Sequence, residues 1–173
     1  RRHVTSVSAM YLLPDAPVAR VLLSGWSLNV NVQAQSAPPL NVTYAYRDPV
    51  DNFLYTYRVD LVNGEPLWLM DGKAPGGRRL NPAAFRVPAG AFSATGRNQV
   101  GHGNEPRNGV RGLPTWQADL ALQRQVRLGG RRTIQLRAEA YNVLNHPNFA
   151  QPDASLGTVV GATGQFIPAP LFG

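Results

Sequence analysis

Hydrophobic and polar residues alternate with a period of two along several segments of the chain. In residues 26–35, every even position is apolar and every odd position carries an uncharged polar side chain. Because successive side chains of a β-strand point to opposite faces, this pattern predicts a strand with one apolar and one polar face. Four further segments alternate with weaker contrast, namely residues 3–13, 53–61, 116–126 and 133–142.

Glycine and proline interrupt the chain between these segments. Gly129-Gly130 lies in the short connection between the last two segments and predicts a β-hairpin, because glycine reaches positive φ at little cost. Residues 63–115 and 151–173 show no sustained period and are predicted to be long irregular loops. Asn81-Pro82 predicts a capped helical turn within the first of them.

Strands of about ten residues, one short turn and very long loops are typical of transmembrane β-barrels, whose strands need about 9–11 residues. The predicted fold class is therefore all-β: an antiparallel meander of about five or six strands forming part of a transmembrane β-barrel, with long external loops. Its polar face is expected to line the lumen, with the residues Asn29, Asn31, Gln33, Asp119, Arg137 and Glu139.

Two alternatives stay open at this point. The charged lumen residues Asp119, Arg137 and Glu139 are expected either to line a substrate path or to form a cross-strand ion network within the wall. At the level of the whole chain, a soluble β-sandwich that binds glycans is the alternative to a barrel, because its strands alternate as well.

Composition narrows the chemistry. Of the 173 residues, 16% are charged, and the absence of cysteine excludes disulfides, thiolate metal sites and cysteine nucleophiles. His3, His102 and His146 lack partners at metal-ligand spacing, and no nucleophile or phosphate-binding motif is present, so we expect no metal, no cofactor and no enzymatic activity. The formal net charge is +7, but the arginines are scattered, so no nucleic-acid partner is expected.

Several segments together resemble one family. Residues 111–122 and 136–149 are similar to the C-terminal barrel strands of TonB-dependent outer-membrane receptors, in particular those with an N-terminal carboxypeptidase-regulatory-like domain. Residues 25–28 with 35–38, the loop sequence Asn81-Pro82-Ala83-Ala84-Phe85 and the sequence Gly96-Arg97-Asn98 resemble further motifs of these receptors. The matches follow one another in the same order over residues 3–157.

The resemblance implies a function and an orientation. Residues 1–173 would be a partial, C-terminal receptor barrel that lacks the plug and the final strand, located in the outer membrane of a Gram-negative-type bacterium and in contact with its lipid. The receptor would import a nutrient ligand, driven by an inner-membrane energy-coupling complex acting through the plug. The Gly129-Gly130 turn would be periplasmic, and residues 63–115 and 146–173 would be external loops. Candidate ligand contacts in these loops are Trp68, Arg97, Asn98 and His102.

Overall fold

The computed structural model describes residues 3–15, 24–96 and 100–173. The chain divides into two compact units. The first, called here the sheet unit, comprises residues 1–36 and 114–148, and the second, the core unit, comprises residues 37–113 and 149–173. Each unit therefore joins segments that are far apart in the sequence.

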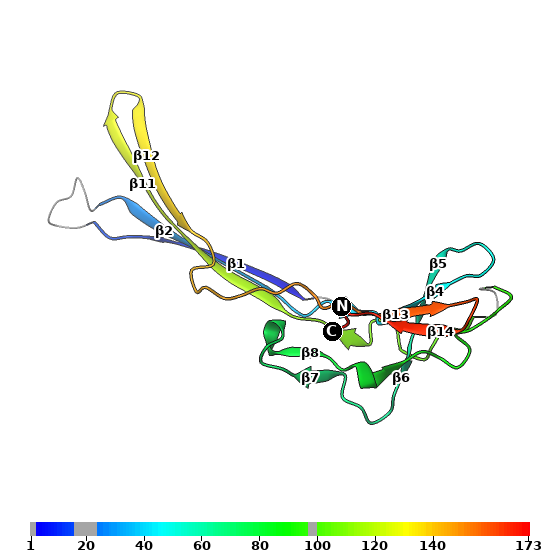
Figure 1. Ribbon diagram of the computed structural model, residues 1–173. Helices are drawn as coiled ribbons and strands as arrows, with labels where there is room; N and C mark the ends of the chain where they lie inside the picture. Colours follow the sequence, from blue (N-terminus) through cyan, green and yellow to red (C-terminus); the bar gives the residue numbers. More distant parts are fainter. Residues whose placement is uncertain (1–2, 16–23, 97–99) are drawn as a thin grey trace. The chain divides into compact units, whose positions relative to one another are not determined.

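Four long antiparallel strands build the sheet unit (Figure 1). They are β1 (Val4–Leu12), β2 (Trp26–Gln35), β11 (Thr115–Gly129) and β12 (Arg132–Ala140), in the spatial order β1-β2-β11-β12. β11 pairs with β2 only as far as Arg124, so the β11–β12 hairpin extends beyond the end of β2. Gly129 and Gly130 have φ values of 100° and 60°, which confirms the predicted turn.

The register of these strands confirms the two predicted faces. On the apolar face, Val30 lies opposite Leu120, and on the polar face Asn31 lies opposite both Ser8 and Asp119. The apolar face stays open to the surroundings, because Tyr11 is 63% exposed and Leu136 is 48% exposed. A soluble sandwich would bury these side chains against a second sheet, so the open face does not fit that alternative.

Beyond β12, residues 141–148 continue along the edge of β11. The Val143 amide donates to the carbonyl of Ala118 at 2.8 Å. The Asn148 side chain bonds both the amide and the carbonyl of Trp116, at 2.9 and 3.0 Å, and the ring of His146 stacks on the Trp116 ring at 4.2 Å. The segment from Asn142 to Asn148 therefore covers the edge of β11 beyond the end of β12.

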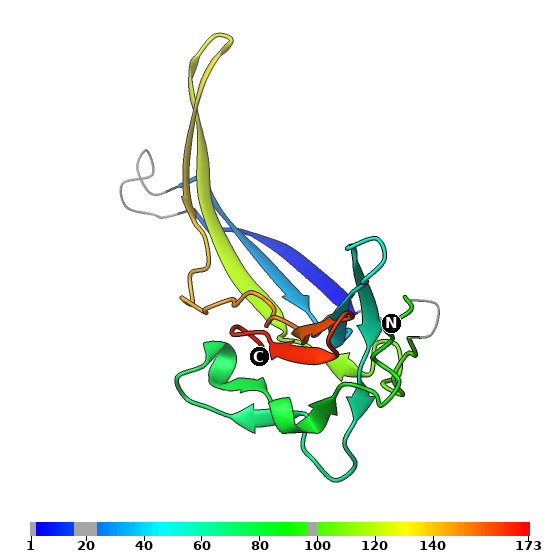
Figure 2. The same ribbon diagram turned by 45° about the vertical axis from the view of Figure 1, so that its right-hand side comes forward.

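The described residues of the core unit form one four-stranded sheet and three short strand pairs (Figure 2). The sheet has the order β14-β13-β4-β5, with β4 (Thr43–Arg47), β5 (Leu54–Arg58), β13 (Ser155–Val160) and β14 (Gln165–Pro168), and its β13–β4 pair is parallel. The pairs are β3 (Pro39–Leu40) with β10 (Val110–Arg111), β6 (Asp60–Leu61) with β9 (Phe85–Arg86), and β7 (Trp68–Met70) with β8 (Arg78–Leu80).

Two short 3₁₀-helices complete this unit, η1 (Pro75–Gly77) and η2 (Pro82–Ala84). The Asn81 side chain accepts a hydrogen bond from the Ala83 amide at 3.1 Å and donates one to the carbonyl of Pro66 at 2.8 Å. Asn81 thus caps η2 as the sequence predicts, and it also fastens the turn to a neighbouring segment.

Buried tyrosine and aliphatic side chains form the hydrophobic core of the core unit. Tyr44, Tyr46 and Leu80 are completely buried. The Tyr46 hydroxyl donates to the carbonyl of Ser93 at 2.6 Å, and the Tyr44 hydroxyl donates to the carbonyl of Gly101 at 3.1 Å. Burial raises the pKa of both phenols, so they stay protonated and remain donors.

The all-β prediction is confirmed, and its details change in two respects. The long strands of the sheet unit number four among the described residues, and residues 53–61 belong to the core unit as β5 and β6 instead of adding a long strand to the meander. Residues 63–115 and 151–173 contain short strands and turns where the sequence predicted irregular loops. Alternation shows which residues share a face, but it does not show which strand becomes the neighbour.

Candidate functional site

Most of the predicted lumen residues meet in one groove on the polar face of the sheet unit. Asn29 of β2, Ala121 of β11 and Glu139 of β12 are aligned by the strand register. The groove encloses about 220 Å³, and five of the six predicted residues line it: Asn29, Asn31, Asp119, Arg137 and Glu139. The sixth, Gln33, lies beside Gln117 in a smaller depression of about 110 Å³.

The charges of this groove form two separate groups. Arg137 pairs with Glu139 on the same strand, and the Tyr141 hydroxyl donates a hydrogen bond to the Glu139 carboxylate. Asp119 accepts hydrogen bonds from the Gln117 side chain at 3.2 Å and from the Asn142 amide at 2.9 Å. The bonds around Asp119 thus hold the turn that begins at Asn142, while the ion pair lies along β12.

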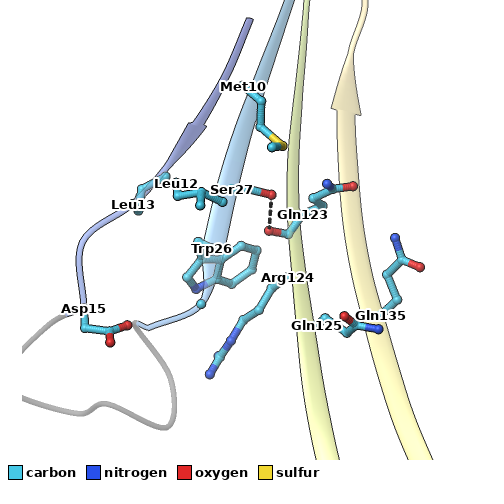
Figure 3. Close-up of a pocket in the computed structure, with 11 residues that line it drawn as sticks. Met10, Leu12, Leu13, Asp15, Trp26, Ser27, Gln123, Arg124, Gln125 and Gln135 are labelled. Carbon is cyan, nitrogen blue, oxygen red and sulfur yellow. Dashed lines mark hydrogen bonds between the residues drawn. The ribbon is translucent and has the colours of Figure 1, made fainter.

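A larger pocket lies at the hairpin end of the same sheet (Figure 3). It encloses about 460 Å³, and its polar lining is mostly uncharged, with Ser27, Gln123, Gln125 and Gln135. The Ser27 hydroxyl donates to the carbonyl of Gln123 at 3.5 Å. Sequence reasoning did not single out this pocket, although the glutamines at positions 123, 125 and 135 were a visible signal.

Trp26 and Arg124 stand side by side at this end of the sheet, as Figure 3 shows. The guanidinium carbon of Arg124 is 5.7 Å from the centre of the indole ring. Both residues belong to the apolar face, where they are direct neighbours across β2 and β11. An aromatic ring beside a cation at the end of an apolar surface is the arrangement found where a membrane meets water.

Of the predicted loop ligands, the structure describes Trp68 and His102, and each has its own neighbours. Trp68 lies under the guanidinium of Arg78, whose carbon is 4.3 Å from the ring centre. His102 packs against Tyr57, with ring centres 5.0 Å apart, and it is exposed. Arg97 and Asn98 lie outside the described residues. Within the described part of the core unit, Trp68 therefore packs against Arg78, whereas His102 packs against Tyr57.

A buried carboxylate in the core unit was also missed by the sequence analysis. Glu105 is fully buried, and among the described residues neither of its carboxylate oxygens has a hydrogen-bond partner. Burial raises the pKa of Glu105, against smaller lowering effects from the Arg58 guanidinium and the Gly109 amide. Its main chain is fixed, because the Glu105 amide donates to the carbonyl of Val59 at 3.0 Å.

Residues 3–15, 24–96 and 100–173 contain the His, Asp and Glu side chains that could serve as metal ligands. No group of three or more His, Asp or Glu side chains there is placed to hold a metal ion. In the same ranges, no helix is long and apolar enough to cross a membrane.

The comparison with known families decides the class of protein. Residues 1–167 match a family model described as an outer membrane beta barrel domain. The chain belongs to this family. No curated protein and no solved structure matches the chain.

Membership in this family explains the open apolar face of the sheet unit. The protein is located in the outer membrane, and lipid covers the apolar side chains. The stretch from Trp116 to Arg124 spans about 26 Å at about 3.3 Å per residue. At a strand tilt of about 40° it covers about 20 Å of the membrane normal, which is most of the apolar band of about 25 Å found in such barrels.

Proposed function

We propose that the protein supplies wall strands and external loops to a TonB-dependent receptor that imports a nutrient across the outer membrane. One observation carries the proposal: the chain combines a sheet that has a lipid-type face and a polar face with a separate unit that has its own core. A simple membrane anchor needs only the sheet. A folded unit, formed by residues 37–113 and 149–173, supports a further task, which is ligand capture.

Loop lengths support the orientation. β11 and β12 are joined by a tight turn at Gly129 and Gly130, whereas residues 37–113 separate β2 from β11 at the opposite end of the sheet. Outer-membrane barrels have short periplasmic turns and long external loops. We therefore assign the glycine turn to the periplasm and the core unit to the cell exterior.

The open edges of the sheet support a role within a larger barrel. In the described part of the chain, β1 pairs only with β2, and β12 pairs only with β11. Unpaired backbone groups are costly in hydrocarbon, so further strands of the receptor are expected at both edges. Coupling to the inner-membrane energy complex would act through the plug of that receptor.

No covalent step is part of this proposal. The groove around Arg137 and Glu139 contains paired charges and amide side chains, which suit passage or binding of a polar solute. His146 stacks on the Trp116 ring in the sheet unit, and His102 packs in a tilted arrangement against the Tyr57 ring in the core unit, which supports structural roles for both. We therefore propose that the protein is not an enzyme.

Cysteine labelling tests the orientation directly, because the natural sequence contains no cysteine. Lys73→Cys in the core unit should react with a membrane-impermeant maleimide on intact cells. Arg131→Cys in the hairpin turn should react only after the outer membrane has been permeabilised. Equal labelling of both variants on intact cells would contradict the proposed orientation.

Uptake measurements test the transport function. Cells with and without the gene are compared for uptake of a panel of labelled nutrients, in the presence and absence of a protonophore. We expect at least one nutrient whose uptake needs both the gene and the proton gradient. If the gene changes no uptake, or if the uptake it supports persists without the gradient, energised import is wrong.

A further inference from the structure

We propose that an aromatic cavity in the core unit is a binding site for a small aromatic carboxylate. The cavity encloses about 490 Å³, within the range of about 300–1,000 Å³ that is usual for small-molecule sites. Its lining is mainly apolar and includes the three phenylalanines Phe85, Phe166 and Phe172. This site goes beyond the proposed transport, since binding in it requires no energised step.

The aromatic walls are held in place by the core. Phe85 is buried, and its ring meets the ring of Phe172 edge to face, with centres 5.8 Å apart. Leu156 of β13 is also buried, and it lines the same cavity. Rings that are fixed in edge-to-face geometry present a preformed surface on which a further aromatic ring can pack.

A glycine makes room for the third ring. Gly157 has a φ of 151°, and a Cβ at this position would lie 2.7 Å from two carbons of the Phe166 ring. Gly157 pairs with Pro168 across β13 and β14, and both Phe166 and Pro168 line the cavity. The backbone at Gly157 therefore leaves room for the Phe166 ring, which a residue with a side chain would displace.

Among the described residues that line this apolar cavity, one is charged. Arg86 follows Phe85 in β9, and its side chain is 68% exposed. Its Nε atom is 3.8 Å from the carboxylate of Asp60, which is a long and therefore weak pairing. Because a guanidinium carries five N–H donors and can bind a carboxylate through two of them, Arg86 gives the cavity a preference for an anionic group.

Size, lining and charge together define the ligand class. Three phenyl rings favour a flat aromatic body, and the arginine favours a carboxylate at one end of it. We use 2-naphthoate as the probe and 2-naphthalenemethanol as its uncharged analogue. Binding is measured by equilibrium dialysis against lipid vesicles that contain the full chain.

Two substitutions test the two parts of the site. Ala169 lines the cavity, so Ala169→Phe fills it and should weaken 2-naphthoate binding by at least about tenfold. Arg86→Gln should weaken binding of the acid by about 3- to 10-fold and leave binding of the alcohol unchanged. Arg86 lies at the surface, so this variant remains informative if Ala169→Phe perturbs the fold.

Matched controls isolate the cavity. Ala162→Phe changes an exposed turn residue that does not line the cavity, and Arg79→Gln removes an arginine that pairs with Asp71 at 3.4 Å elsewhere in the unit. Both controls should bind 2-naphthoate as the natural chain does. Absence of saturable binding, or equal binding by the natural chain and Ala169→Phe, would overturn the site. An equal effect of Arg86→Gln on acid and alcohol would overturn the anionic preference.

Discussion

The sheet unit and the core unit use similar alternating sequences in different surroundings. In β12, every residue is exposed, although four of the nine are apolar. In β4, the alternating residues Tyr44 and Tyr46 are completely buried. The difference shows that alternation creates two faces in both units, and that what covers the apolar face is decided separately. Lipid covers it in the sheet unit, and other residues of the same chain cover it in the core unit.

The two units also differ in where their charged side chains lie, because different surroundings cover their apolar faces. The sheet unit keeps Asp119, Arg137 and Glu139 on its polar face, away from the lipid. The core unit has buried the carboxylate of Glu105, where water cannot solvate it. In the sheet unit these three charges avoid the lipid, and Arg124 of the apolar face lies beside Trp26 at the end of that face. The core unit instead buries the costly charge of Glu105.

The largest expected effect is loss of packing in the core unit. Leu80 is completely buried, so Leu80→Ala should lower the free energy of unfolding of this unit by about 2–5 kcal/mol. Leu136→Ala, in the exposed apolar face, should cost clearly less because it leaves no cavity within the protein. Denaturant unfolding in lipid vesicles measures both. Equal costs would contradict the distinction between the two units.

A slightly smaller effect is expected from a charge placed on the lipid face. Leu120→Arg should destabilise the membrane-inserted sheet by about 2–4 kcal/mol, because Leu120 faces the lipid near the middle of β11. Ala121→Arg is the matched control, since the next residue faces the polar side beside Asn29 and Glu139. Urea titration in vesicles should separate the two variants, and identical midpoints would mean that the faces are assigned wrongly.

Removal of the buried charge should stabilise the core unit. The pKa of Glu105 is raised in the folded state above its ordinary value of 4.5, so the folded chain binds the proton more tightly than the unfolded chain. Stability should therefore fall as the pH rises above that ordinary value, and Glu105→Gln should abolish this dependence. At neutral pH we expect a gain of about 1–2 kcal/mol.

The pH series itself provides the control for Glu105. Unfolding of the natural chain and of Glu105→Gln is followed between about pH 4 and about pH 8. Asp71→Asn, at an exposed ion pair of the same unit, should leave the slope of stability against pH nearly as in the natural chain. A natural chain that becomes more stable as the pH rises through this range would contradict the assigned role of Glu105.

The smallest of the expected effects concerns a cap. Asn81→Ala should cost about 0.5–2 kcal/mol, because it removes the bond to the Ala83 amide and the bond to the Pro66 carbonyl. Asn81→Ser should keep a bond to the Ala83 amide and lose the bond to the Pro66 carbonyl, so its stability should fall between those of the natural chain and Asn81→Ala. Thermal unfolding of the three chains gives the order, which would be wrong if the serine variant were the least stable.

Local sequence patterns predicted much of the sheet unit and of its groove. The alternation of residues 26–35 placed Asn29 and Asn31 on one face, and the paired glycines Gly129 and Gly130 placed the hairpin. The predicted cap at Asn81 is likewise a local signal. Such features depend on side chains within a few residues of one another, and the period of a strand carries that information along the chain.

Contacts between distant segments were not predictable in this way. Residues 53–61 alternate like the wall strands but pair with β4 and β9, and the bonds of Asp119 go to Gln117 and the distant Asn142. The aromatic cavity joins Phe85 to Phe166 and Phe172, which the sequence separates widely.

By itself, the sequence determined which side chains share a face, where the tight turn lies and that a membrane-type barrel wall is present. The tertiary structure alone decided which strands become neighbours, which carboxylate is buried and where an apolar cavity remains. The physical reason is that a face follows from the two-residue repeat of an extended backbone. The choice of partner depends instead on the total packing and hydrogen bonding of segments far apart in the chain.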